Sequence, residues 1–341
     1  MNHETETDID RHATVGGSGL IDSVPVIDLQ GLVQGDGIDK KHSAITEIAE
    51  ASHRWGFFQV VNHGIADEHL DRIWNQTHRF FSRPQADKDT LQRTLDNPWG
   101  YYNNELTKNQ RDKKEVFDFT SPGEDPIYHG ANRWPDDESF RQVMHDHFAI
   151  CTRLSRHLLQ AFCVGLNLPP DFLRNEFSPE QTSFIRLNYY PVGDPLLGTG
   201  KEHEAVAALG IHNHTDAGAL TVLLQDEVGG LQVYHDGQWH GVPVVEGALV
   251  INTGDMMQVW SNDEYQAAVH RVLAMTDVQR FSIPYFFNPS ATTKVAPLPS
   301  IVSDDRPQLY SEIDWAKFRG SRSDGDFANY GTEVQISQYR L

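Results

Sequence analysis

Between residues 182 and 289 the chain alternates short β-rich segments with turn signals, and this spacing constrains the fold more than any other feature. The turns include Asp236-Gly237, Glu246-Gly247 and Thr253-Gly254-Asp255. Short strands at regular intervals, joined by glycine turns, are typical of antiparallel barrels and jelly rolls. We therefore predict a barrel or jelly roll in this half of the chain.

Helical periodicity dominates the residues before this β-rich region. Apolar side chains recur every three or four residues from about Asp137 to Val164, and Gly165 follows near the end, so we predict one long amphipathic helix packed along a sheet. Five shorter elements are predicted upstream: an edge strand at Val24–Leu29, a helix at Lys41–Trp55, a strand at Phe57–Val61, a helix that Pro84 stops, and a strand at Val116–Phe119. The expected class is mainly β with flanking helices (α+β).

Composition divides the chain into three parts. Residues 1–20 are polar and without periodicity, so we expect a disordered N-terminus. Residues 21–135 form an N-terminal region that is helical and loop-rich. Residues 136–341 form the jelly-roll core and a polar tail with a helical patch near Ser311–Phe318. We expect the two folded parts to form one compact unit.

The charge balance excludes one large class of partner. The chain carries 28 Lys and Arg residues against 48 Asp and Glu residues, a formal net charge of −20. Binding to a phosphate backbone requires clustered positive charge, so we expect no nucleic-acid partner. The two cysteines, Cys151 and Cys163, fall among apolar residues of the long helix, where buried thiols are expected rather than a disulfide.

Hydropathy gives no indication of a membrane partner. No run approaches the roughly 20 apolar residues of a membrane span, and the first 20 residues lack the basic start and apolar stretch of a signal peptide. We therefore expect a cytoplasmic protein that acts on a small molecule, with the monomer as the favoured state.

Three residues are candidate metal ligands. His214 and Asp216 lie two positions apart at the start of the apolar strand predicted at Ala219–Leu224, and His270 lies on another β-like segment 54 residues after Asp216. Residues two apart in a strand point to the same face, so the imidazole and the carboxylate can converge. Two histidines and one carboxylate on one side of a metal are the arrangement expected for non-haem iron(II) oxygenases.

Two alternatives remain open from the residues alone. His212 also lies two positions from His214, on the same predicted strand face, and competes with it as a ligand. Zinc accepts the same kinds of ligand and would give hydrolysis rather than oxidation.

A carboxylate anchor is predicted ten residues beyond His270. In Arg280-Phe281-Ser282 the alternation places Arg280 and Ser282 on one strand face, where a guanidinium fork and a hydroxyl match a carboxylate. On the strand at residues 184–190 the same alternation collects polar side chains on one face, namely Arg186, Asn188 and Tyr190. Buried polar groups need partners, which a bound acid supplies.

Several further motifs accompany these residues. The front of the chain contains Val24–Leu29 and Gly56–Ile65, and the middle contains Trp99–Tyr102 and Lys114–Phe119. The second half contains five ordered motifs: His214–Thr221, Gly229–Val233, Asn252–Asp255, His270–Val272 and Arg280–Ser282. Over roughly residues 22–340 the chain resembles the isopenicillin N synthase-like family of iron(II)/2-oxoglutarate dioxygenases, which includes many plant and microbial enzymes of specialised metabolism.

The resemblance implies a double-stranded β-helix (jelly-roll) core with iron(II) at its mouth, and it favours His214 over His212. The implied metal ligands are His214, Asp216 and His270; the implied 2-oxoglutarate contacts are Arg280, Ser282, Tyr190 and Asn188. For the substrate pocket we expect Phe286, Arg186, Tyr101 and Tyr102. The iron centre itself is the expected catalytic group, with 2-oxoglutarate and O₂ as co-substrates and ascorbate as reductant. Succinate and CO₂ are the implied by-products of hydroxylation, desaturation or cyclisation.

Two other functions stay open. Isopenicillin N synthase and the ethylene-forming oxidase of plants share the Arg-x-Ser pair but use no 2-oxoglutarate, so Arg280 indicates an acid without identifying it. A non-catalytic jelly-roll binding protein is the other alternative. The link at residues 192–211 is longer than is usual in the family, and a lid or a surface loop would account for it.

Overall fold

The computed structural model describes residues 23–34, 38–107, 110–123, 125–177, 181–196, 209–328, 331 and 333–341. The predicted disordered segment at residues 1–20 and most of the 192–211 link lie outside the described residues. None of the helices in the described part of the chain has the length and apolar character that a membrane crossing requires.

A large sheet of eight strands forms the centre of the molecule, in the order β1-β2-β12-β9-β14-β7-β6-β3. Its strands are β1 (Val26–Asp28), β2 (Phe57–Val61), β3 (Gly100–Tyr102), β6 (Glu115–Thr120), β7 (Phe184–Tyr190), β9 (Leu220–Gln225), β12 (Leu249–Thr253) and β14 (Arg280–Phe287). Only β1 and β2 pair in parallel. β1 forms one edge of this sheet, as predicted from Pro25, which immediately precedes it.

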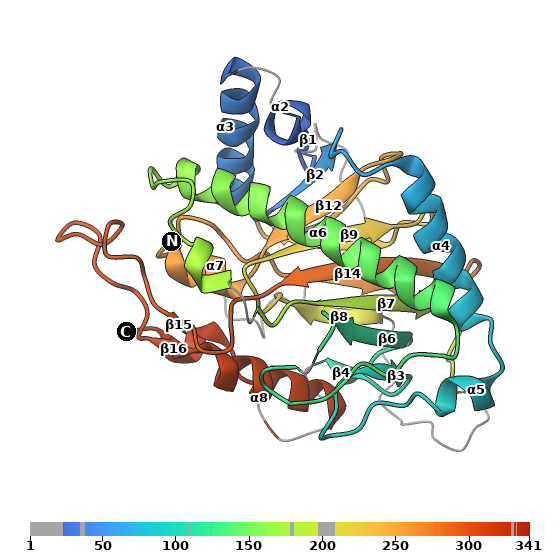
Figure 1. Cartoon of the computed structure of the whole chain (residues 1–341). Helices are drawn as coiled ribbons and strands as arrows, with labels where there is room; N and C mark the ends of the chain where they lie inside the picture. The colour runs from blue at the N-terminus through green and yellow to red at the C-terminus, as the bar shows by residue number, and fades with distance from the viewer. Residues whose placement is uncertain are drawn as a thin grey trace.

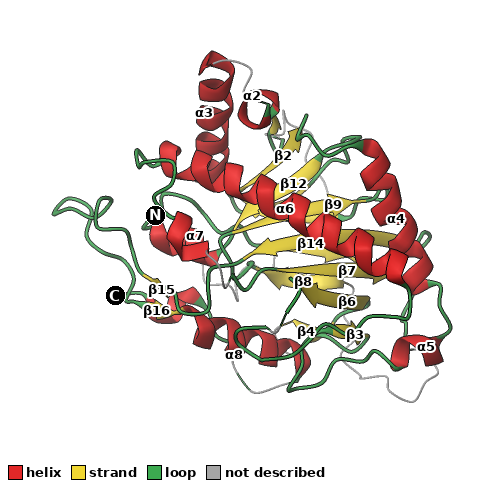
Figure 2. Ribbon diagram, viewed as in Figure 1, coloured by secondary structure: helices red, strands yellow, loops and turns green. Residues whose placement is uncertain are grey.

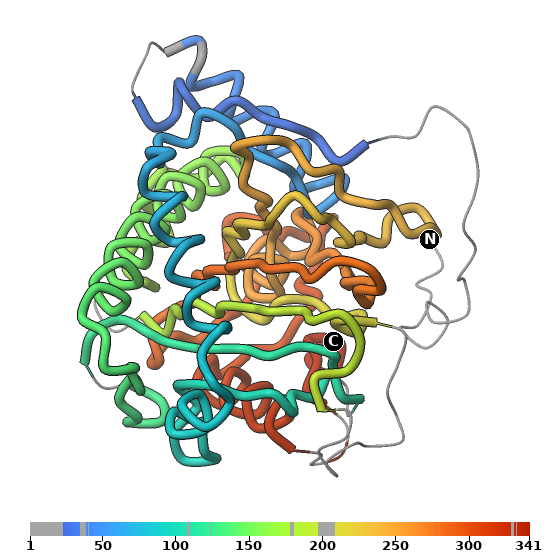
Figure 3. The backbone as a smooth tube through the Cα atoms, turned by 90° about the vertical axis from the view of Figure 1, so that its right-hand side faces the viewer, coloured from blue at the N-terminus to red at the C-terminus, as the bar shows by residue number. Residues whose placement is uncertain are grey.

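Strands from distant parts of the chain lie side by side in this sheet. β14, β7 and β6 are neighbours in space (Figures 1 and 3), although β6 belongs to the N-terminal region. The predicted division of the chain at residue 135 therefore separates strands that share one sheet.

A smaller sheet of four strands, ordered β11-β10-β13-β8, faces the large one. Its strands are β8 (Leu209–His214), β10 (Leu231–His235), β11 (Gln238–Gly241) and β13 (His270–Leu273). Two further pairs lie outside both sheets: β4 (Leu106–Thr107) with β5 (Gln110–Arg111), and β15 (Lys294–Val295) with β16 (Ile313–Asp314). Two facing antiparallel sheets confirm the predicted jelly-roll core.

Helices α3 (Ile38–Arg54), α4 (Asp67–Phe81) and α6 (Glu138–Gly165) cover the other face of the large sheet (Figure 2). The other α-helices of the described residues are α2 (Gln30–Val33), α5 (Gln85–Asp89), α7 (Asp255–Trp260) and α8 (Trp315–Phe327). α6 is the predicted long helix, and it begins where the Asp137 side chain accepts a hydrogen bond from the backbone N–H of Phe140. Cys151 and Cys163 are buried on α6 and both are free, which confirms the prediction of buried thiols.

Two apolar clusters separate the layers. The larger one fills the space between α3, α4, α6 and the outer face of the large sheet, and it includes Phe58, Phe80, Leu158 and Ile283. The smaller one lies between the two sheets and includes Phe57, Leu223 and Val233. Beside this smaller cluster, apolar packing gives way to polar side chains and a cavity.

The C-terminal tail differs from the prediction of a helix near 311–318. Residues Ile313–Asp314 form strand β16, and helix α8 begins only at Trp315, where the Asp314 side chain accepts from the Lys317 N–H. The helix then continues to Phe327. The sequence pattern did not predict this extension, because the regularly spaced apolar residues end at Phe318. The buried residues beyond it are polar: Arg319, Arg322 and Ser323.

Candidate metal centre and adjoining cavity

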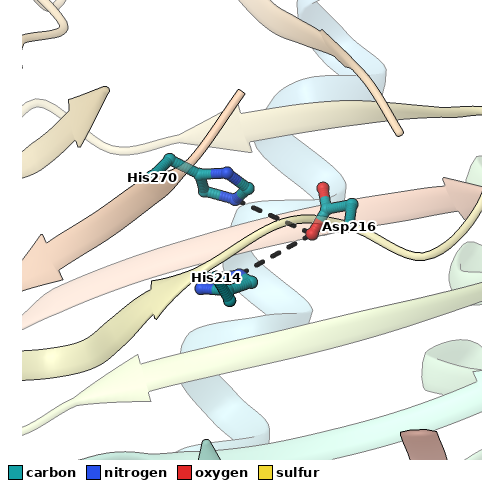
Figure 4. A group of neighbouring side chains, drawn as sticks. All are labelled: His214, Asp216 and His270. Atoms are coloured by element: carbon teal, nitrogen blue, oxygen red, sulfur yellow. Dashed lines mark ion pairs between the residues drawn. The ribbon is translucent and has the colours of Figure 1, made fainter. Parts of the chain in front are cut away.

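The three predicted metal ligands converge at one end of the space between the sheets (Figure 4). His214 is the last residue of β8, His270 is the first of β13, and Asp216 follows β8 in a loop. Each histidine places Nε2 at 3.7 Å from Oδ1 of Asp216, and all three ligand atoms lie within 4.8 Å of one another. A single cation placed among these atoms can contact all three.

Hydrogen bonds fix which imidazole nitrogen faces the centre. His214 Nδ1 lies 2.7 Å from the backbone oxygen of His212, and His270 Nδ1 lies 3.0 Å from that of Ala268. A carbonyl oxygen only accepts, so each Nδ1 carries the proton and donates, and each Nε2 keeps its lone pair. This is the tautomer that a metal-binding histidine requires.

The Asp216 carboxylate is oriented by its second oxygen. Oδ2 accepts hydrogen bonds from Thr221 Oγ1 at 2.5 Å and from Asn252 Nδ2 at 2.8 Å. Both donors come from the large sheet, on β9 and β12. Oδ1 is therefore left to face the two imidazoles. Such outer contacts hold a ligating carboxylate in position.

Burial sets the protonation of the cluster. Burial, with the neighbouring His270, lowers the pKa of His214 to about 3, so this imidazole is neutral at physiological pH. Burial alone would raise the pKa of Asp216, but the two imidazoles and its two hydrogen bonds hold it below the ordinary value. The centre therefore presents a carboxylate and a neutral imidazole, the forms that bind metal.

Two details of the sequence argument about this cluster were wrong. His214 does not begin the apolar strand at residues 219–224; it ends β8 in the small sheet, and the loop with Asp216 crosses to β9 in the large sheet. Nor does His212 share a face with His214. The pairs His270↔His214 and Val272↔Ile211 leave one extra residue in β8, and such a bulge shifts the alternation of side chains. His212 consequently contacts Asp112, with Nδ1 at 2.9 Å from Oδ1.

A cavity of about 140 Å³ adjoins the metal cluster, between β7, β9 and β14 of the large sheet and β8 and β13 of the small one. Arg280 lines it and is 0% exposed. Its Nε and Nη1 atoms have no hydrogen-bond partner, and Nη2 has one long contact of 3.5 Å to Gln225 Oε1. Among the described residues no carboxylate forms an ion pair with Arg280. Burial of an unpaired guanidinium is costly, so this site requires an anion.

The other predicted co-substrate contacts surround Arg280. Across the ladder between β14 and β7, Arg280 pairs with Tyr190 and Ser282 pairs with Asn188. The guanidinium lies 4.8 Å from the centroid of the Tyr190 ring, and Asn188 Nδ2 donates to Ser282 Oγ at 3.3 Å. All four side chains line the cavity, as the predicted alternation of both strands requires.

The four residues predicted for the substrate pocket separate into two pairs. Phe286 and Arg186 line the cavity. Tyr101 and Tyr102 do not: Tyr101 is buried with its hydroxyl 2.8 Å from Glu115 Oε2, and Tyr102 stacks on Phe327 and donates to its backbone oxygen. Strand β3, which carries both tyrosines, is the last strand of the large sheet, beyond β6. It lies too far along the sheet to reach the metal cluster.

Helix α8 contributes residues that the sequence did not indicate. Arg319, Arg322 and Asp326 line the cavity from this helix. Arg322 donates from Nη2 to the backbone oxygen of Thr215 at 2.6 Å, between two of the metal-ligand candidates, and pairs through Nη1 with Glu333 at 2.9 Å. The C-terminal tail is thereby connected to the metal loop. Thr221 and Asn252 lie within recognised motifs, but their contacts to Asp216 are visible only in three dimensions.

The residues present fit iron(II). Two imidazoles and one carboxylate lie on one side of the centre, and the cavity with its unpaired cation lies beside them. This donor set on one face, with other positions left for exogenous ligands, is the arrangement of non-haem iron(II) oxygenases. Zinc accepts the same kinds of ligand, and the proteins to which the chain is similar decide between the two metals.

Comparison with known proteins agrees with this chemistry. Residues 181–289 match the 2OG-Fe(II) oxygenase superfamily, and residues 24–137 match the family described as non-haem dioxygenase in morphine synthesis N-terminal. Protein DMR6-LIKE OXYGENASE 2 of Arabidopsis thaliana is 31% identical over 306 residues, covering 87% of this chain and 82% of that protein. A probable 1-aminocyclopropane-1-carboxylate oxidase of Dianthus caryophyllus is 32% identical over 290 residues, covering 82% and 84%.

A solved structure extends the similarity to the whole fold. The crystal structure of JOX2 in complex with 2OG, Fe and JA superposes with a TM-score of 0.78 at 27% identity, covering 98% of this chain and 97% of that one. The N-terminal and catalytic regions thus both have counterparts in known enzymes. On this evidence the chain belongs to the 2-oxoglutarate–iron(II) oxygenase superfamily and is a non-haem iron(II)/2-oxoglutarate-dependent dioxygenase.

Proposed function

We propose that this dioxygenase oxidises a small organic metabolite in the cavity between the two sheets. In the proposed arrangement His214, Asp216 and His270 hold iron(II), and Arg280 with Ser282 binds the distal carboxylate of 2-oxoglutarate. One observation supports this most directly: a fully buried guanidinium without a carboxylate partner lines the same cavity as the metal cluster.

The chain's own residues supply binding and orientation. When bound, iron(II) and 2-oxoglutarate supply the activation of O₂, with succinate and CO₂ as products of the co-substrate. Arg280 neutralises one carboxylate of the co-substrate, and the Tyr190 ring at 4.8 Å holds the guanidinium in place. The apolar wall, which includes Phe57, Leu223 and Phe286, excludes water from the reacting groups.

The relatives support a small-molecule substrate. The JOX2 structure is a complex with 2OG, Fe and JA, and a feruloyl CoA ortho-hydroxylase of Arabidopsis thaliana is also similar to this chain. Hydroxylation is the default outcome we propose. Desaturation and cyclisation remain alternative outcomes of the same chemistry.

The oxidase alternative keeps a specific observation in its favour, because one relative is named as a probable 1-aminocyclopropane-1-carboxylate oxidase. In that alternative Arg280 would bind the substrate's own carboxylate. Asn188 and Tyr190, which lie opposite Ser282 and Arg280, favour 2-oxoglutarate, because the resemblance assigns both residues to that co-substrate.

Anaerobic addition of iron(II) and 2-oxoglutarate tests the proposal. We expect the visible charge-transfer band of the chelate, saturating at one 2-oxoglutarate per protein, followed by succinate release when O₂ and substrate are admitted. Absence of the band with iron bound would favour the oxidase.

Asp216→Ala tests the metal assignment. Removal of the only carboxylate among the three ligand candidates should abolish stoichiometric iron binding, the band and turnover. Asp305→Ala, which removes an exposed carboxylate, is the matched control and should keep all three. Stoichiometric iron in Asp216→Ala would show the ligand assignment to be wrong.

A further inference from the structure

Five cationic side chains line the cavity, and they differ in whether they have a carboxylate partner. The five are Lys114, Arg186, Arg280, Arg319 and Arg322. Lys114 contacts Glu105 at 2.6 Å, Arg186 contacts Asp118 at 2.8 Å, and Arg322 contacts Glu333 at 2.9 Å. Among the described residues, no carboxylate pairs with either of the other two. In the proposed function, 2-oxoglutarate is the anionic partner of one of these two, Arg280.

Arg319 is the other unpaired cation. It is 8% exposed, and its Nε has no hydrogen-bond partner. Its guanidinium lies 4.7 Å from the centroid of the Phe184 ring, a contact that offsets only part of the cost of burying a charge. A charged side chain this deeply buried is expected to have an anionic partner.

The carboxylates of the cavity wall do not supply that partner. Glu105 and Glu333 are engaged by other cations, and Asp216 faces His214 and His270. Asp326 lies seven residues beyond Arg319 on α8, roughly 10 Å along the helix axis. Burial and the nearby Glu105 raise the pKa of Asp326 to about 7, so its carboxyl is only partly ionised at neutral pH. The missing anion is therefore expected from outside the chain.

The surface next to Arg319 is flat and aromatic. Phe184, which Arg319 covers, stacks on Phe286 with ring centroids 4.5 Å apart and planes at 23°. Both rings line the cavity, as does Pro284. A ligand held by Arg319 thus extends along an apolar wall, which favours a planar or ring-bearing body over a polar one.

We propose that Arg319 is the specificity-determining residue for the primary substrate and that this substrate is a small ring-bearing monocarboxylic acid. A single guanidinium offers one bidentate site, which matches one carboxylate. This inference rests on the proposed function, because it assumes that 2-oxoglutarate occupies Arg280. Arg280 and Arg319 then divide the cavity: the first binds the acid that is consumed with O₂, and the second orients the acid that is oxidised.

Calorimetry on the wild-type protein tests this proposal with defined probes. The protein is loaded anaerobically with iron(II) and saturating 2-oxoglutarate and titrated with phenylacetate and cinnamate, each beside its neutral amide. We expect each acid to bind about 10- to 100-fold more tightly than its amide, the range for hydrogen bonds to a charged group. Equal binding of acid and amide would overturn the proposal.

Variants of α8 assign the preference to one residue. Arg319→Met should lower the affinity for the acids to that for the amides, and Arg319→Lys should retain part of the preference. Lys317→Met removes an exposed cation, 83% accessible, from the same helix and should behave as wild type. If Arg319→Met retained the preference, Arg319 would not be the acid site. Because Arg319→Met removes an unpaired buried charge, we expect its melting temperature to be no lower than that of wild type.

The 2-oxoglutarate band separates this inference from the proposed function. All α8 variants should keep the band, since Arg319 does not contact the co-substrate site in this arrangement. If the band were absent from wild type, the proposed function would fail. The inference about Arg319 would be overturned if Arg280→Met removed the preference for acids and Arg319→Met did not. That result would place the bound acid at Arg280.

Discussion

The two faces of strand β14 differ in the kind of side chain they carry and in what those side chains contact. On one face Phe281, Ile283, Tyr285 and Phe287 pack into the apolar cluster beneath the helices. On the other face Arg280, Ser282, Pro284 and Phe286 line the cavity. The same alternation occurs on β7, where Ile185 and Leu187 belong to the core while Arg186 and Asn188 face the cavity. In each strand, every second residue therefore packs in the core and stabilises the fold, and the residues between them line the site.

This division predicts that substitutions separate by face. A change on the cavity face should alter ligand binding and leave the free energy of unfolding of the unliganded protein nearly unchanged. A change on the helix face should do the opposite. The three predictions that follow test this separation in order of expected size.

Arg280→Met carries the largest expected effect. Loss of the guanidinium should raise the KM for 2-oxoglutarate about 100-fold, since a charge-assisted bidentate contact is lost, while iron binding is retained. The variant should unfold at an equal or higher denaturant concentration when 2-oxoglutarate is absent, because a buried unpaired charge is removed. Steady-state kinetics and urea titration measure the two quantities.

Arg141→Met is the control for this substitution. It removes an arginine from the exposed side of α6, where the side chain is 45% accessible, and should change neither quantity. An unchanged dependence on 2-oxoglutarate in Arg280→Met would mean that the cavity face of β14 does not bind the co-substrate.

The second prediction concerns the helix layer and pH. His147 on α6 is fully buried, with Nδ1 at 3.2 Å from Nε2 of His69. Burial, and the charge of His69, lower its pKa from 6.5 to about 3. A folded-state pKa below the unfolded value means that stability is complete above pH 6.5 and is lost as the pH falls towards the folded pKa. The protein should therefore weaken in mild acid.

The expected loss from His147 is about 2 kcal/mol between pH 6.5 and about pH 4.5. Urea unfolding at several pH values measures it. The variant His147→Gln should show a shallower decline than wild type by this amount, and its iron content at pH 7 should be normal. Parallel declines in the two proteins would exclude His147 as the source of acid sensitivity.

The faces of β7 and β14 could be predicted from sequence, because alternation in a paired strand is a local property. The site beyond them could not be predicted fully. From the residues alone His212 competed with His214 as a ligand; the bulge in β8 turns His212 towards Asp112, and a bulge leaves no reliable mark in composition. Tyr101 and Tyr102 were assigned to the pocket from a motif, whereas their strand lies at the sheet edge.

The α8 wall shows a different limit of the sequence. Arg319 and Arg322 follow the last of the regularly spaced apolar residues of the helix. Their side chains are buried because they face the cavity, which a helical pattern does not predict. The contact from Arg322 to the Thr215 carbonyl joins positions 107 residues apart. Tertiary placement of this kind is not encoded in any local spacing.

Tyr285→Phe is the smallest of the three changes and the sharpest test of the division. The Tyr285 hydroxyl lies 2.8 Å from Thr152 Oγ1 on α6, and its removal should lower the free energy of unfolding by about 1 kcal/mol, the usual worth of one neutral hydrogen bond. Thr152 still donates to the Phe148 carbonyl, so no buried donor is left without a partner. Both neighbours of Tyr285 along the strand, Pro284 and Phe286, face the cavity.

A double-mutant cycle with Thr152→Val isolates this contact, because the two substitutions should be less than additive by the energy of the shared hydrogen bond. The KM for 2-oxoglutarate and the iron affinity should be the same in all four proteins. A shift in either one would mean that strain on the helix face reaches the cavity through the strand backbone, and the two faces of β14 would then be coupled rather than separate. If the KM for 2-oxoglutarate and the iron affinity stay unchanged while the free energy of unfolding falls, the cavity face of β14 does not respond to changes in the core on its helix face.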